Sequence, residues 1–169
     1  MKMKTKTTSA VDIKVADEVW IVTALMHRGN PKRVDFTIEE IMQRVRNEGL
    51  AGKLRPGVYA HVVQHCVANR IPNSGRYRIL FETAPGRRRL FRSGDNYDPA
   101  REGAKMVPAR EEIPSEYSSL LDWYRDSTPN NVEERIKNDP LLALYGDGKD
   151  LWADEPADEY VRRIREGWE

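Results

Sequence analysis

A pair of histidines is the first candidate for a chemical site in this sequence. His61 and His65 stand four positions apart, and Cys66 follows directly. On a helix this spacing puts two imidazoles on one face, where they could hold zinc. The chain offers no third or fourth ligand at metal-site spacing, and no glutamate follows the first histidine. We therefore expect polar histidines beside a core cysteine, with no metal.

Carboxylates give a second possible site. Asp95, Asp98 and Glu102 lie in one segment together with Arg92 and Arg101. We expect solvated turn residues there, because the segment has no periodic pattern that would bury it. The sequence has no Ser/His/Asp order, phosphate loop or carboxylate pair that predicts catalysis. We expect no enzyme and no cofactor.

Binding to a polyanion is the chemistry that the residues favour. A glutamine can pair with adenine, small residues permit close approach to bases, and arginines contact backbone phosphate. The predicted DNA-binding residues are Lys53, Arg55, Gly57, His61, Gln64, His65, Arg87, Arg88 and Arg89.

Three predicted helices and a hairpin must position these side chains. Helical periodicity predicts helices over 16–27, from Thr37 to Gly49, and over 56–69. Thr37 and Glu40 have the capping-box spacing, and Gly49 fits a helix stop. In the third helix, the predicted buried stripe is Tyr59, Val62, Val63 and Cys66, and the outward face is Gly57, His61, Gln64 and Ala68.

The period then changes from helical to alternating. Strands are predicted over 77–81 and 87–92, joined by a turn at 83–86, with arginines at the hairpin tip. An irregular segment over 93–113 precedes a helix over 114–126. Three helices followed by a hairpin is the order of a winged helix-turn-helix, in which the third helix enters the major groove. The predicted class is mainly α with a small β-hairpin (α+β), followed by an extended, partly helical tail.

Charge divides the chain into two halves. Residues 1–110 contain 21 Lys and Arg against 11 Asp and Glu, whereas residues 111–169 contain 7 against 16. A basic half attracts nucleic acid, and an acidic half suggests a second partner. We predict a flexible basic arm at 1–15, a winged-helix-like domain at 16–126, a linker at 127–137 and a binding tail at 138–169.

Composition places the chain among soluble proteins. Charged residues make up 33% of the 169 residues, and the one cysteine excludes an internal disulfide. No apolar run approaches the roughly 18 residues of a membrane span. We expect a cytoplasmic protein without a secretory signal and with no membrane partner.

The tail cannot build a core alone. Residues 138–169 carry apolar anchors separated by polar breaks, which is typical of a segment that folds on binding. The alternative is an amphipathic helix that packs back on the same chain. The tail contains D-P-L-L-A-L, then G-K-D-L-W, then D-E-Y-V-R-R-I-R-E-G-W. This pattern resembles the toxin-neutralising tail of virulence-associated protein B (VapB) antitoxins.

That resemblance implies a partner, a PIN-domain (VapC-type) ribonuclease toxin. An antitoxin arginine would enter the toxin's metal-binding carboxylates, and Arg165 is favoured over Arg162 and Arg163. The tail residues that it assigns to toxin binding are Leu141, Leu142, Leu144, Leu151, Trp152, Tyr160, Val161, Arg162, Ile164, Arg165 and Trp168.

The N-terminal part carries a weaker resemblance. HCVAN (65–69), YRILF (77–81), RRLFRSGD (88–95), PAREGAK (99–105) and LLDWY (120–124) resemble a prokaryotic winged-helix-like module without an assigned activity. A winged helix is unusual before a VapB tail, so the operator geometry of that family cannot be carried over.

The sequence therefore predicts a type II antitoxin that binds its own operator, as a homodimer if the operator is two-fold symmetric. The main alternative is a winged-helix transcriptional regulator whose acidic tail packs in cis and which has no toxin partner.

Overall fold

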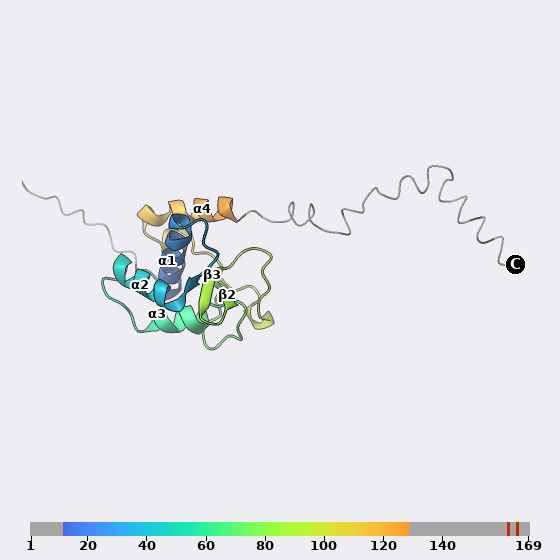
Figure 1. The fold of residues 1–169 in the computed structure, drawn as a ribbon, viewed down its shortest axis with the longest axis horizontal. Coiled ribbons are helices and arrows are strands. Elements are labelled where there is room, and N and C mark those ends of the chain that lie inside the picture. The colour runs from blue at the N-terminus through green and yellow to red at the C-terminus, as the bar shows by residue number, and fades with distance from the viewer. Residues whose placement is uncertain (1–11, 129–161, 163–164, 166–169) are drawn as a thin grey trace, which may run out of the picture. The chain divides into compact units, whose positions relative to one another are not determined.

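The computed structural model describes residues 12–128 together with Arg162 and Arg165. The chain divides into two units, residues 1–129 and 130–169, and the fold below is that of the first. Within the described residues it combines four α-helices with a three-stranded antiparallel sheet (Figure 1). The predicted α+β class is confirmed. The predicted arm up to residue 11 and the predicted linker and tail from residue 129 onward lie outside the described residues, apart from those two arginines.

Helix α1, Val15–Gly29, is the centre of the core, and eleven of its residues are buried. The buried set includes the two acids of its first turn, Asp17 and Glu18. Lys105 Nζ lies 2.7 Å from Asp17 Oδ1, and Arg55 Nη2 lies 2.5 Å from Glu18 Oε2. Cations from distant parts of the chain therefore neutralise the acidic helix start, which could not otherwise enter the core.

Strand β1, Phe36–Thr37, leads directly into helix α2, Ile38–Glu48. The predicted capping box is present, since Glu40 N donates to Thr37 Oγ1 and Thr37 N donates to the Glu40 carboxylate. Gly49 ends the helix in the left-handed region with φ 60°. The signals read at both ends of this helix are confirmed.

Helix α3, Gly57–Ala60, continues as a single π-helical turn, His61–His65. The prediction of a helix to residue 69 is wrong beyond this turn. The next residues pair with a strand instead, as Ala68 N donates to Leu80 O at 2.7 Å. The backbone groups that would have extended the helix are satisfied by the sheet.

The predicted hairpin is present, but its bounds were wrong. Strand β2 is Leu80–Ala84 rather than 77–81, so it includes the first two residues of the predicted turn, and strand β3 is Arg87–Leu90, which ends two residues before the predicted 92. A two-residue turn joins them, with Gly86 at φ 73°. Strand β1 pairs with the other side of β3, which gives the order β1-β3-β2. A two-residue strand such as β1 has no alternating pattern, so sequence periodicity could not predict it.

Three short 3₁₀ turns follow the sheet, and helix α4, Ser119–Ser127, ends the described segment. The predicted helix over 114–126 is wrong at its start, because residues 115–117 form a separate 3₁₀ turn. Leu120 is buried, and the Tyr124 ring meets Trp20 edge-on at 5.8 Å. Helices α3 and α4 contact opposite ends of α1 (Figure 1).

Candidate nucleic-acid interface

The outward face of α3 and its π-helical turn differs from the predicted face. Val58, Val62 and Cys66 are fully buried, whereas Tyr59 is 58% exposed. The prediction that Tyr59 is buried is therefore wrong, and so is the exposed position given to Ala68, which is buried. The prediction used a helical wheel with 3.6 residues per turn. A π turn has i to i+5 hydrogen bonds and more residues per turn. The buried residues of this segment are therefore four positions apart.

Around Tyr59, the partly exposed residues of this face are Ala60, Val63 and Gln64. Gln64 does not project freely, because its Nε2 donates to Ile71 O at 2.5 Å. The amide is therefore shared with the loop that follows the helix. Pairing with a base would require this bond to be exchanged.

The two histidines lie against the 75–77 loop. His61 Nδ1 is 2.8 Å from Gly57 O, and its ring lies 5.0 Å from His65 and 5.9 Å from Tyr77. Burial lowers the pKa of His61, so it is neutral at physiological pH. The structure thus brings His61 and His65 into an aromatic contact with Tyr77 of the loop, and Gly57 contributes a backbone carbonyl to His61. Among the described residues, no cluster of three His, Cys, Asp or Glu side chains could hold a metal.

A buried arginine that sequence reasoning missed holds that loop in place. Arg101 is fully buried, and its guanidinium donates to the carbonyls of Gln64, His65, Arg70 and Tyr77 at 2.6–2.9 Å. The sequence placed Arg101 only as a neighbour of carboxylates expected in a solvated turn, and its burial was not predicted. The carbonyls at the end of the π turn lack helical partners, and the planar guanidinium satisfies several of them at once.

The arginines of the hairpin are engaged within the molecule. Arg87 Nη2 lies 2.6 Å from Asp35 Oδ1, and Arg89 Nη1 lies 2.7 Å from Asp95 Oδ2. Arg88 is fully buried and donates to Val62 O at 3.2 Å. The prediction that Arg88 contacts phosphate is therefore wrong. Successive residues of a strand face opposite sides of the sheet, so Arg88 and Leu90 both point into the core.

Of the two cations that precede α3, one is engaged within the molecule and the other is not. Arg55 donates to Glu18 and, at 2.7 Å, to Ile13 O, which ties this loop to the start of α1. Lys53 is exposed and has no ion-pair partner among the described residues. Arg76, in the loop that packs against the π-helical turn after α3, is also exposed and unpaired within that part of the chain.

Charge in the described unit is nearly balanced. Residues 12–128 contain 19 Lys and Arg against 16 Asp and Glu, a net charge of +3. Twelve of these cations form ion pairs within the unit. The exposed cations without such a pair in the described residues are Arg28, Lys32, Lys53, Arg76 and Arg92. Lys53 and Arg76 flank α3, which makes this helix the better candidate for contact with a polyanion than the hairpin.

No family model, curated protein or solved structure matches this chain. Function is therefore inferred from the geometry of the described residues and from the sequence of the tail.

The predicted toxin-binding residues fall outside the described residues, apart from Arg162 and Arg165. Both arginines are helical and exposed. The other members of that set, which lie outside, are Leu141, Leu142, Leu144, Leu151, Trp152, Tyr160, Val161, Ile164 and Trp168. None of the helices described is both long and apolar enough to cross a bilayer.

Proposed function

We propose that this chain is the antitoxin of a type II toxin–antitoxin pair. Residues 12–128 act as a winged helix on operator DNA, and residues 138–169 neutralise a PIN-domain ribonuclease. The observation that carries the DNA-binding half is the element order α1-β1-α2-α3-β2-β3 with β1 paired to β3. This order places a helix pair in front of a hairpin, as a winged helix does. The antitoxin half rests on the tail sequence.

The contact face proposed for DNA is α3 with its flanking cations. Tyr59, Ala60 and Val63 offer apolar contacts to thymine methyl groups, and Gln64 offers an amide to base edges. Lys53 and Arg76 reach phosphates on either side. The hairpin arginines are left out of this proposal, since their charges are paired within the protein.

Anisotropy titrations test the DNA contact. The full chain is titrated onto labelled DNA from upstream of its own reading frame over a range of salt concentrations. Lys53→Gln and Arg76→Gln should each weaken binding and reduce the salt slope by about one. Arg28→Gln, an exposed cation near α4, is the matched control and should leave both unchanged. Equal effects of all three variants would contradict the assignment of α3.

Co-purification tests the antitoxin half. The tagged chain is co-expressed with its neighbouring reading frames, at full length and truncated after Asn131. Retention of a small PIN protein by the full-length chain alone is the expected result. Arg165→Gln should then restore more ribonuclease activity than Arg162→Gln, because the guanidinium fork pairs with the toxin carboxylates. If neither the full-length nor the truncated chain retains a protein, the chain is a winged-helix regulator whose tail has no toxin partner.

A further inference from the structure

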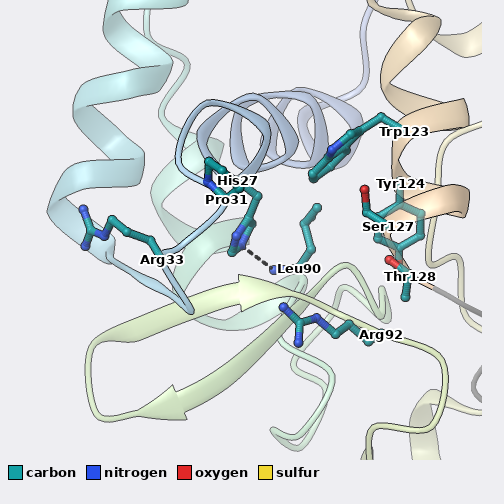
Figure 2. A pocket seen from close by; sticks show the side chains of 9 residues that line it. All are labelled: His27, Pro31, Arg33, Leu90, Arg92, Trp123, Tyr124, Ser127 and Thr128. Atoms are coloured by element: carbon teal, nitrogen blue, oxygen red, sulfur yellow. Dashed lines mark hydrogen bonds between the residues drawn. The ribbon is translucent and has the colours of Figure 1, made fainter. Parts of the chain in front are cut away.

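A cavity lies at the end of α1 away from α3. Its volume is about 170 Å³. The end of α1, the loop after it, the end of β3 and helix α4 line it, and one side is open to solvent (Figure 2). A cavity of about 150 Å³ lined by apolar side chains accepts benzene, so this one has room for an aromatic ring.

One side of the cavity is apolar and aromatic. Trp123 projects from α4 toward His27, with Leu90 between the helix and the sheet (Figure 2). His27 is uncharged, because burial and the nearby charge of Arg92 lower its pKa to about 4. Its Nε2 accepts the N–H of Leu90 at 3.4 Å. These faces can sandwich a planar ring without presenting a charge to it.

The other side presents hydrogen-bond donors. Arg92 extends along the cavity, and Ser127 and Thr128 bring hydroxyl groups from the end of α4 (Figure 2). Arg33 lies at the rim, with its guanidinium bound to Glu40 at 2.6 Å. The wall therefore combines two hydroxyl groups with the guanidinium of Arg92, which has no ion-pair partner among the described residues.

Among the described residues, no carboxylate lines the cavity. The carboxylate of Asp95, whose charge acts on Tyr124, is held by Arg89 and by the backbone N–H of Arg92. Arg92 forms no ion pair with any described residue, although twelve of the nineteen cations of this unit do. A cavity with an unpaired arginine and no internal counter-charge is complementary to an anion.

We propose that this cavity binds a small aromatic carboxylate. The ring lies between Trp123 and Leu90, and the carboxylate accepts the bidentate fork of Arg92 and a hydroxyl hydrogen bond from α4. The site is independent of α3, because the two lie at opposite ends of a 15-residue helix, roughly 22 Å long. A ligand in the cavity would therefore not cover the face of α3, and DNA on α3 would not cover the cavity.

The test uses the full chain and three defined probes. Benzoate, indole-3-carboxylate and phenyl phosphate are titrated by calorimetry, and benzyl alcohol serves as the neutral counterpart of benzoate. At least one carboxylate should bind about tenfold more tightly than benzyl alcohol, because a charge-assisted hydrogen bond is stronger than a neutral one and tenfold corresponds to about 1.4 kcal/mol. The ligand should also shift the indole N–H resonance of Trp123 more than that of the buried Trp20, which reaches the cavity only through the ring of Tyr124.

Two variants separate a specific site from general attraction of anions. Arg92→Gln keeps a polar side chain that can donate a hydrogen bond but removes the charge, and it should weaken carboxylate binding about tenfold. Lys53→Gln removes a cation at the far end that is also exposed and has no ion pair within the described residues, and it should change nothing. The proposal is overturned if no carboxylate probe binds the wild-type chain, or if both variants weaken binding equally. Binding of phenyl phosphate alone would also overturn it, in favour of a phosphate site.

Discussion

Replacement of Arg101 by methionine should be the most disruptive single change to the candidate interface. The methionine fills a similar volume without any donor. The carbonyls of Gln64, His65, Arg70 and Tyr77 would then lose bonds of 2.6–2.9 Å to a guanidinium. The loop that packs on α3 would lose its main attachment.

The expected loss in the free energy of unfolding follows from the number of hydrogen bonds and from the single guanidinium that makes them all. A hydrogen bond to a charged group contributes about 1.5–3 kcal/mol, and four independent bonds would give roughly 6–12 kcal/mol. These four depend on one buried guanidinium, whose removal also relieves its desolvation cost. We therefore expect a loss of about 4 kcal/mol in the free energy of unfolding, a large part of the 5–15 kcal/mol typical of whole domains.

Urea unfolding of the full chain, followed by circular dichroism, measures this loss. With a denaturant slope of about 2 kcal/mol per molar, the midpoint should fall by about 2 M. Arg76→Met is the matched control, because Arg76 is exposed and unpaired in the described residues, and its midpoint should move little. A loss below about 1 kcal/mol for Arg101→Met would refute the view that this arginine holds the loop.

Three further outcomes are expected. From pH 7 to pH 5, stability should fall by about 2 kcal/mol more in the wild type than in His27→Gln. The pKa of His27 is 6.5 unfolded and about 4 folded, so at this residue only the unfolded chain takes up a proton in this window, as urea unfolding at each pH would show. Gly75→Ala should lower the melting temperature, because its Cβ would lie 2.7 Å from His65 Cβ, whereas Gly29→Ala meets nothing within 4 Å and should not. Cys66 should resist an aromatic disulfide reagent until the protein unfolds, since it is fully buried and burial raises the pKa of its thiol; rapid labelling under native conditions would contradict this.

The parts of the fold that sequence predicted are those with local causes. The capping box at Thr37 and Glu40 joins residues three apart, and the hairpin follows from alternation on both sides of a two-residue turn. The face of α3 was misjudged because Tyr59 was assigned by a uniform helical period, which the π turn at 61–65 breaks. Nothing in the local sequence distinguishes that turn from an ordinary helix.

The candidate sites were harder to predict because distant residues make them. Arg87 and Arg88 look like free cations in the sequence, but Asp35 and the carbonyl of Val62 bind them from 52 and 26 positions away. The cavity of His27 and Trp123 joins two elements that are far apart in the chain. A charge total for a stretch of sequence cannot show which of its cations are neutralised within the fold.

The burial of α1 also has a consequence for the order of events during synthesis. The helix is complete at Gly29, but Leu120 and Tyr124, which cover one end of it, are made more than 90 residues later. At about 5–20 residues per second, the helix waits roughly 5–20 s for them on the ribosome. During that interval its apolar surface is open to aggregation, so the nascent chain is a natural client for a chaperone that binds apolar helices.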